Sequence, residues 1–262
     1  MNSFTRCENG VIADAAFYNR LQSEDIASVL LLSDTHGAVD AVRWILSTFS
    51  EKCQACLFAG DGAQDMFTVV RDAAADRITI PPVIIMAQGN CDSQYYPPVF
   101  PDSKNPKPFA LPAYQQKQIA QQQIMLTHGH LFHVELDGRK LSMAAEHRDC
   151  TIAVYGHTHM QSIECFGSVT AINPGSPLHP RGKSYGGFAV LSIDNTHEID
   201  TVRVGTTGTV DNAASENIRI QTCGKLQFYR LIRENNGSFC AAMHTAYPLP
   251  LNNGATAKNQ MD

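Results

Sequence analysis

Ser33-Asp34-Thr35-His36-Gly37 directly follows an apolar run from Ile26 to Leu32, and this junction decides the fold. The run predicts a fully buried β-strand that ends in a turn. Asp34 and His36 would then lie just past the carboxyl end of a strand, where open α/β sheets place their ligands. An Asp-x-His pair alone is a weak signal, because turn residues and helix caps account for most such pairs. Its meaning depends on how the other strands of the chain end.

Two more predicted strands end in a polar residue beside glycine. Residues 38–49 have the apolar spacing of a helix, and a short strand over residues 56–59 then ends at Gly60-Asp61-Gly62. A second helix over residues 66–73 leads to a buried strand over residues 82–87, which ends at Gly89-Asn90. Alternating strands and helices predict a parallel sheet with right-handed crossovers. Asp34, Asp61 and Asn90 should therefore converge at one edge of this sheet.

Histidines follow the next two predicted strands. A strand over residues 123–127 ends at His128-Gly129-His130, and a strand over residues 151–155 ends at Gly156-His157-Thr158-His159, with a helix over residues 141–148 between them. Apolar and polar residues then alternate, which predicts antiparallel hairpins. Residues 162–166 should pair with 169–173, and residues 188–193 with 198–204. We expect this antiparallel half to form a second sheet stacked on the first.

The remaining segments carry weaker patterns. Residues 1–25 form an N-terminal extension with a short helix over residues 11–21, and the main domain spans residues 26–205. Residues 206–262 form an appendage: a polar linker over 206–217, two strands over 218–232 around Cys223-Gly224, and a frayed polar tail. Residues 97–112 contain six prolines, so we expect a surface loop there. This loop is either a lid or substrate wall of the site, or a plain insertion.

Composition indicates an ordinary globular protein. Hydrophobic residues make up 44% of the 262 residues, and the net charge of −5 argues against a nucleic-acid-binding surface. We expect a cytoplasmic protein without a membrane segment, because no secretory signal or long apolar run is present. The eight cysteines should then be reduced thiols. Cys53-x-x-Cys56 lacks a second such pair to complete a zinc site and leads into an apolar run, which favours core packing.

The residues at the strand ends share one chemical property, because all of them can bind a metal ion. They are Asp34, His36, Asp61, Asn90, His128, His157 and His159. A mixture of imidazole and oxygen ligands suits Zn, Mn, Fe or Ni. Seven ligands are too many for one tetrahedral ion and fit two divalent ions that share a carboxylate. Two such ions clamp a phosphoryl group and supply a bridging hydroxide near neutral pH, so the sequence predicts hydrolysis of a phosphate ester.

The same motifs, in the same order, resemble the calcineurin-like metallophosphoesterase superfamily. The resemblance covers residues 28–193 and includes the later loop Asn173-Pro174-Gly175-Ser176. It is greatest to the small bacterial and archaeal phosphodiesterase branch, to which the eukaryotic retromer scaffold subunit also belongs. It implies an α/β fold in which two stacked mixed β-sheets form a sandwich flanked by helices, with the metals at one sheet edge.

The resemblance also implies how the ligands divide between two ions. One ion takes Asp34, His36, Asp61 and His159, and the other takes Asp61, Asn90, His128 and His157. Asp61 is then the bridging ligand, and the amide of Asn90 also reaches a phosphate oxygen of a small-molecule ester. The expected reaction is in-line attack by a hydroxide that bridges the metal ions.

The sequence departs from many members of the superfamily at Cys91. These members carry His directly after the Asn, where it is proposed to protonate the leaving group. A thiol with a pKa near 8.5 is a poor substitute, and phosphodiesters with good leaving groups would suffer least. His130 is either a replacement acid or phosphate contact, or support for a neighbouring ligand. Asp92 should orient a ligand or the loop.

Three functions use this set of residues differently. The leading one is a metal-dependent phosphodiesterase or phosphatase, and the alternative is a catalytically weak metal-binding scaffold of the same fold. The presence of all seven ligand positions favours the enzyme. A nuclease would require a basic groove, which an acidic chain does not indicate. The sequence leaves open whether the chain forms a homo-oligomer.

Overall fold

The computed structural model describes residues 2–100, 107–196 and 221–251. The apolar run before Asp34 forms β3 (Ile26–Leu32), and the polar turn after it leads into α2 (Val39–Thr48). β4 (Ala55–Phe58), α3 (Ala63–Ala74) and β5 (Val83–Met86) follow as predicted. β3, β4 and β5 pair in parallel. The first half of the chain therefore has the predicted alternation of strands and helices.

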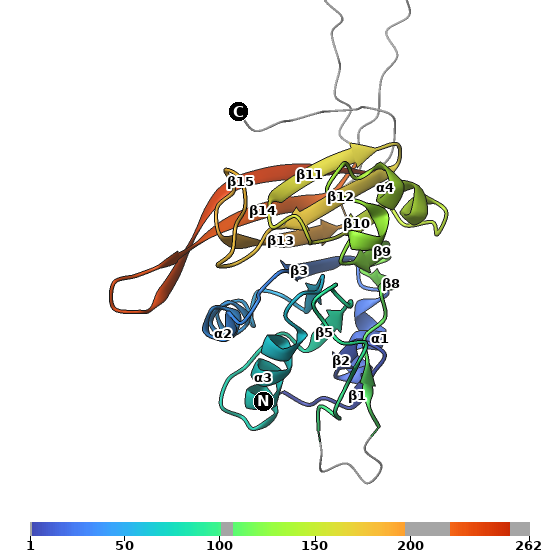
Figure 1. Ribbon diagram of the computed structural model, residues 1–262. Coiled ribbons are helices and arrows are strands. Elements are labelled where there is room, and N and C mark those ends of the chain that lie inside the picture. The colour runs from blue at the N-terminus through green and yellow to red at the C-terminus, as the bar shows by residue number, and fades with distance from the viewer. Residues whose placement is uncertain (1, 101–106, 197–220, 252–262) are drawn as a thin grey trace, which may run out of the picture.

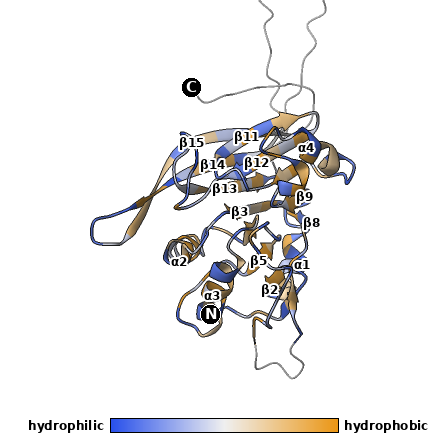
Figure 2. Cartoon of the chain, viewed as in Figure 1, coloured by the Kyte–Doolittle hydropathy of each residue, from blue (hydrophilic) through white to orange (hydrophobic). Residues whose placement is uncertain are grey.

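The first sheet has eight strands, in the order β1-β2-β5-β4-β3-β13-β14-β15. Its N-terminal strands β1 (Arg6–Glu8) and β2 (Val11–Ala13) precede a short helix, α1 (Ala15–Leu21). Its C-terminal strands are β13 (Gly187–Asp194), β14 (Gln221–Arg233) and β15 (Phe239–Leu251). The long hairpin β14–β15 extends beyond the rest of the molecule (Figure 1), and its hydrophilic tip is visible in Figure 2.

The second sheet has five strands, in the order β11-β12-β10-β9-β8. These are β8 (Tyr114–Ile119), β9 (Gln122–Thr127), β10 (Ile152–Val154), β11 (Gln161–Phe166) and β12 (Val169–Pro174). A 3-10 turn, η1 (His130–Phe132), and α4 (Arg139–Glu146) connect β9 to β10. β10 runs parallel to both β9 and β12, and the other two pairs are antiparallel. The sheet is therefore mixed.

Alternate residues of the central strands point into two different cores. Val29 and Leu31 of β3 face the second sheet, and pack in one cluster with Leu126 of β9 and Val154 of β10. Leu30 and Leu32 lie on the opposite face of β3 and pack against α2 and α3. On the second sheet, α4 covers the face that points away from the first sheet. Figure 1 shows these layers. The predicted α/β sandwich of two mixed sheets flanked by helices is confirmed.

Several predicted elements differ from the structure. The predicted pairing of residues 162–166 with 169–173 is confirmed. β13 pairs with β3 and β14, and the partner predicted for it, residues 198–204, lies outside the described residues. Residues 221–233 form one strand with a register shift between Thr222 and Gly224, not two strands. The helix predicted over residues 11–21 begins only at Ala15, because β2 pairs with β5. The linker 206–217 and most of the tail lie outside the described residues.

The proline-rich loop contains a short ladder that the sequence did not predict. β6 (Tyr95–Tyr96) pairs with β7 (Phe109–Ala110) at the base of the loop. The described ends of the loop, residues 97–100 and 107–112, pack against the N-terminal segment and α3, since Val99 and Phe109 belong to the core beneath that helix. Whether the loop acts as a lid stays a prediction, because residues 101–106 lie outside the described part of the chain.

The cysteines of the C-x-x-C motif belong to the core, as predicted. Cys53 and Cys56 are buried and free. Burial raises the pKa of Cys53 to about 12 and raises that of Cys56 as well. Both sulfurs therefore stay protonated. In the described ranges, no helix is long and apolar enough to cross a bilayer.

Candidate metal centre

Each of the seven ligand-type residues lies at the carboxyl end of a strand. Asp34, Asp61 and Asn90 follow β3, β4 and β5 of the first sheet, whereas the histidines after β9 and β10 come from the second sheet. Five of the seven have positive φ angles: Asp34, His36, Asp61, His157 and His159. A side chain other than glycine at such an angle costs on the order of 1 kcal/mol, and such residues concentrate at functional sites. The turns after the strands therefore bend the chain so that these side chains face one another.

Glycines allow the turns to approach closely. A Cβ atom on Gly89 would overlap the carboxylate and backbone N of Asp61, and one on Gly156 would overlap Ser33 and Asp34. The backbone of His157 can then donate to both carboxylate oxygens of Asp34, at 3.2 and 3.0 Å. These contacts fix the carboxylate of Asp34 at the meeting point of the two sheets.

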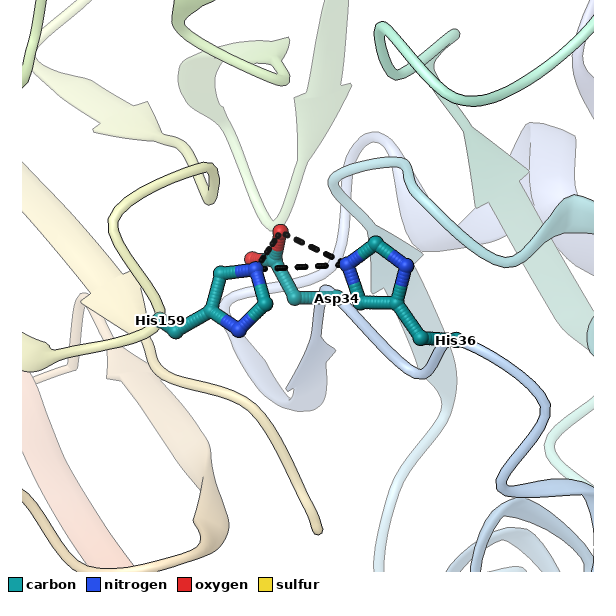
Figure 3. Close-up of side chains that lie close together, drawn as sticks. All are labelled: Asp34, His36 and His159. Atoms are coloured by element: carbon teal, nitrogen blue, oxygen red, sulfur yellow. Dashed lines mark hydrogen bonds and ion pairs between the residues drawn. The ribbon is translucent and has the colours of Figure 1, made fainter. Parts of the chain in front are cut away.

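One half of the centre contains two imidazoles and a buried carboxylate. His159 Nε2 lies 3.3 Å from Asp34 Oδ1 and 3.2 Å from His36 Nε2 (Figure 3). His36 Nε2 also lies 3.7 Å from Asp61 Oδ2. The ligand atoms of Asp34, His36 and His159 all lie within 4.8 Å of one another, close enough to share one ion.

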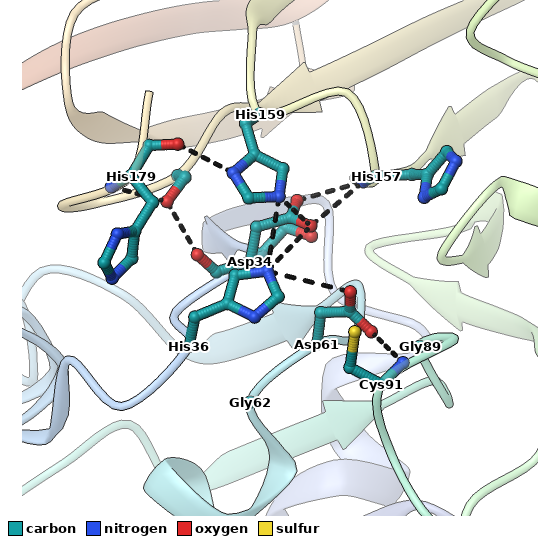
Figure 4. A network of polar contacts seen from close by, with 12 residues as sticks. Asp34, His36, Asp61, Gly62, Gly89, Cys91, His157, His159 and His179 are labelled. Atoms are coloured by element: carbon teal, nitrogen blue, oxygen red, sulfur yellow. Dashed lines mark hydrogen bonds and ion pairs between the residues drawn. The ribbon is translucent and has the colours of Figure 1, made fainter. Parts of the chain in front are cut away.

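The other half shares both carboxylates, Asp34 and Asp61, with the first. His128 Nε2 lies 3.3 Å from Asp61 Oδ2 and 3.0 Å from Asn90 Oδ1, and His157 Nδ1 lies 3.0 Å from the same amide oxygen. Asp34, Asp61 and His128 form a second group with ligand atoms within 4.8 Å. Figure 4 shows Asp61 beside His36 and below Asp34.

Hydrogen bonds to backbone carbonyls behind the centre determine which ring nitrogen of His128 and of His159 faces the centre. His128 Nδ1 lies 2.8 Å from the carbonyl oxygen of Ala59, and His159 Nδ1 lies 2.7 Å from that of His179. A carbonyl accepts only from N–H, so both rings carry a proton on Nδ1. A neutral ring can then offer its Nε2 lone pair to a metal ion. When no ion is bound, a second proton on Nε2 of His128 can take its place: burial lowers the pKa of His128, but its hydrogen bond to Asp61 and the charges of Asp34 and Asp61 raise it overall. The donor set therefore fits divalent metal ions.

The calcineurin-like phosphoesterase superfamily domain matches residues 28–196 of this chain. The chain belongs to this superfamily. Phosphodiesterase YfcE of Escherichia coli K12 is 29% identical over 180 residues, which cover 63% of this chain and 88% of that protein. Probable metallophosphoesterase YsnB of Bacillus subtilis is 25% identical over 168 residues, covering 64% and 85%. As a member of the superfamily, this chain is a phosphoesterase that works with divalent metal ions.

Solved structures show the same fold. Vacuolar protein sorting 29 from Cryptosporidium parvum aligns with a TM-score of 0.54 and 18% identity, over 86% of this chain and all of that one. The structural match covers a larger share of the chain than residues 28–196, the extent of the superfamily domain. The resemblance inferred from the strand-end motifs is therefore confirmed.

The two aspartates of the phosphoesterase centre have opposite pKa shifts. Burial raises the pKa of Asp34 to about 6. The positive charge of His128 lowers this pKa, but by less than burial raises it. Burial also raises the pKa of Asp61, but hydrogen bonds from His128 and from the backbone of Cys91 outweigh it and hold this pKa below its usual range. Asp61 is therefore the stronger permanent anion of the pair.

The structure brings all seven predicted residues together, with His130 and Cys91 beside them. The ring of His130 lies 5.5 Å from that of His128 and 6.2 Å from that of His157, measured between centroids. Its Nδ1 is buried without a hydrogen-bond partner in the described part of the chain. The Cys91 sulfur lies within 4.8 Å of ligand atoms of His36 and Asp61, and burial, followed by Asp61, raises its pKa.

Sequence reasoning missed the groups that hold the centre from behind. Ser176 donates its hydroxyl to the backbone oxygen of Asp34 at 2.6 Å, and Asp65 accepts from Thr35 Oγ1 at 2.5 Å and from Gly37 N at 2.9 Å. The carbonyl of His179 orients His159. Only Ser176 lies in a quoted motif. A backbone carbonyl leaves no mark in a sequence, so the role of His179 had no signal.

Proposed function

We propose that this chain is a phosphodiesterase of small-molecule phosphate esters that uses two divalent ions. The two groups of ligands would hold one ion each: Asp34, His36, Asp61 and His159 for one, and Asp61, Asn90, His128 and His157 for the other. One observation carries the proposal. Asp61 Oδ2 lies 3.3 Å from His128 Nε2 and 3.7 Å from His36 Nε2, so one carboxylate serves both groups.

The bound ions would supply an activated water molecule and charge neutralisation at the phosphoryl oxygens. The chain's own residues would do the rest. His128 and His159 are held in one tautomer by Ala59 and His179, so their inward nitrogens keep their lone pairs. Asn90 has its amide oxygen toward two histidines, which leaves its amide nitrogen, 3.4 Å from the Cys91 sulfur, to approach a phosphate oxygen.

His130 is the proposed group for the leaving-group side. Burial lowers its pKa, and the charges of His128 and His157 lower it further, so the ring is neutral near pH 7. A neutral imidazole with an unpartnered Nδ1 can donate or accept a hydrogen bond with the ester. Burial, followed by Asp61, raises the pKa of Cys91, so this side chain stays a protonated thiol and is not a thiolate base. This pattern favours diesters with good leaving groups over monoesters.

The deciding experiment measures hydrolysis of bis-p-nitrophenyl phosphate by the full chain after metal removal and reloading with Mn, Zn, Fe or Ni. We expect turnover that depends on added metal, with Mn as the first candidate, and that a chelator abolishes. Asp61→Ala should lower it at least 100-fold while circular dichroism stays unchanged, because losing a bridging ligand weakens both groups. Two equivalents of bound metal without turnover would favour the scaffold alternative. Cytoplasmic location and homo-oligomer formation stay predictions.

A further inference from the structure

Residues 176–186, here called the 176–186 strap, connect β12 to β13 beside the metal centre. The strap contains His179, Arg181 and Lys183, and no aspartate or glutamate. The whole chain has a net charge of −5, whereas the strap beside the metal centre has only basic charged residues. All three basic residues are exposed.

Backbone contacts fasten the strap to the ligand His159. The carbonyl of His179 accepts from its Nδ1 at 2.7 Å, and the backbone N–H of Arg181 donates to the carbonyl oxygen of His159 at 3.2 Å. The ring of His179 also meets that of His36 edge-on, with centroids 6.0 Å apart. Figure 4 shows His179 next to His159 and His36. The strap therefore borders the half of the centre that contains the more exposed ligand, His36.

Within the described part of the chain, no hydrogen-bond or ion-pair partner is seen for the side chains of Arg181 and Lys183. By contrast, Arg43, Arg77 and Arg139 each pair with an aspartate. The backbone contact of Arg181 with His159 nevertheless places this residue at the edge of the centre.

The opposite side of the centre has different chemistry. Glu135 Oε2 lies 3.9 Å from Nε2 of His157, and Leu131 and Leu136 nearby are 57% and 80% exposed. A substrate that spans the centre thus meets positive charge toward the strap, and apolar surface with one carboxylate toward Leu131.

We propose that Arg181, supported by Lys183, binds a second anionic group of the substrate, a phosphate or a carboxylate, next to the metal centre. The inference rests on the proposed function for the reacting phosphoryl group and extends it to a substrate class. That class is phosphoesters with a further negative charge on one substituent. Arginine suits this role because its planar fork binds such oxygens in pairs.

The test compares two ligands that differ in one charge and have a P–C bond that the enzyme does not cleave. Isothermal titration calorimetry of the metal-loaded full chain gives the Kd of 2-carboxyethylphosphonate and of propylphosphonate. We expect the carboxylate-containing ligand to bind about tenfold more tightly, the effect of one charge-assisted hydrogen-bonded pair. Arg181→Met should reduce this ratio to about one, and Arg181→Lys should leave an intermediate ratio.

Arg77→Met is the matched control, because Arg77 pairs with Asp72 at the end of α3. Its ligand ratio should equal that of the unchanged protein. An equal Kd for the two ligands in the unchanged protein, or a ratio that survives in Arg181→Met, overturns the inference. Hydrolysis of bis-p-nitrophenyl phosphate is measured separately. A protein that keeps the ligand ratio but lacks turnover contradicts the proposed function and leaves the anion site standing.

Discussion

Asp92 holds the turn that carries Asp61 without facing the ion positions itself. Its Oδ1 accepts from the backbone N–H groups of Gly62 and Ala63 at 3.0 and 2.9 Å. Its Oδ2 accepts from those of Asp61 and Gly89 at 2.8 and 3.0 Å. One carboxylate therefore ties the loop after β4 to the loop after β5. The sequence-based expectation was that Asp92 orients a ligand or the loop, and these bonds show that it orients the loops.

Replacing Asp92 with Asn should weaken metal binding although the residue is no ligand. The amide group would turn an NH₂ toward two backbone N–H groups that need an acceptor, so Asp61 would lose its fixed position. We expect a 10- to 100-fold rise in metal Kd, the usual effect of removing a group that orients a ligand. Stability should fall by about 1–3 kcal/mol from the unpaired buried N–H groups.

Isothermal titration calorimetry measures the metal Kd of Asp92→Asn, and urea denaturation measures its free energy of unfolding. Asp40→Asn is the control, because the side chain of Asp40 is 81% exposed and pairs only with Arg43 among the described residues. A metal Kd in Asp92→Asn that equals the control value would show that the loop does not need this carboxylate.

The ligand-type residues were predictable because each is next to a strong local signal, an apolar strand followed by glycine. His128 and His157 come from strands of the second sheet, yet the carboxyl-end rule placed them correctly. Their partners behind the centre were not predictable. Arg181 is in no motif, and its place beside His159 depends on how the chain returns from β12 to β13.

At the element scale, buried strands, amphipathic helices and the hairpin β11–β12 could be predicted, whereas the edge strands β8 and β15 could not. β3 and β5 are continuous apolar runs, whereas β8 (Tyr114–Ile119) contains Gln at three of its six positions and lies at the edge of its sheet. β15 is also an edge strand. A strand with one unpaired edge and one exposed face has little hydrophobic pattern, since much of it contacts water.

Gly224 misled the prediction of two strands over residues 218–232. It was taken as a turn, but the structure uses it for an irregularity inside β14, with φ of 156° and a register shift beside it. A Cβ atom there would overlap the backbone oxygen of Ser192 on β13. Glycine inside a strand thus marks a close approach of two backbones, a use that its sequence context does not distinguish from a turn.

The ion pairs between α2 and α3 make one contribution to stability that should depend on pH. Asp72 accepts from Arg43 Nη2 at 2.8 Å and from Arg77 Nη1 at 2.9 Å. Arg43, the larger cause, and Arg77 lower the pKa of Asp72. Since the folded pKa lies below the unfolded one, the contribution is present above the unfolded pKa near 4 and is lost as pH falls through the folded pKa.

Asp72→Asn should therefore lower stability at pH 7 by no more than about 1 kcal/mol, the range of surface ion pairs. Urea denaturation from pH 7 to pH 3.5 should show the difference from the unchanged protein shrinking toward the acidic end. Added salt should shrink it as well, because the pair is screened. A difference that grows as the pH falls would contradict the assigned sign.

At the scale of the whole molecule, the metal centre joins the two sheets of the sandwich. Asp34, Asp61 and Asn90 come from the first sheet, and the ligand histidines after β9 and β10 from the second. The first sheet also includes strands from residues 6–13 and 221–251. The domain boundaries near residues 26 and 206 stay predictions. The first sheet nevertheless contains strands from before residue 26 and from after residue 206, so it crosses both predicted boundaries.

Metal binding should therefore stabilise the entire fold and not the loops alone. An ion that binds the folded chain and not the unfolded one adds about 2.7 kcal/mol at a free concentration 100 times its Kd. For a chain of this size that corresponds to a rise in Tm of about 5–10 °C. Differential scanning calorimetry before and after chelation measures it, with Glu51→Gln at an exposed position as the control that keeps the full shift. Asp61→Ala should lose most of the shift, because both ligand groups share this carboxylate.

We expect two results. The unchanged protein should show a single cooperative transition whose Tm rises with metal, and the Tm of Asp61→Ala should stay nearly fixed. An equal shift in both proteins would mean that the ions bind elsewhere, and the bridging assignment of Asp61 would fail.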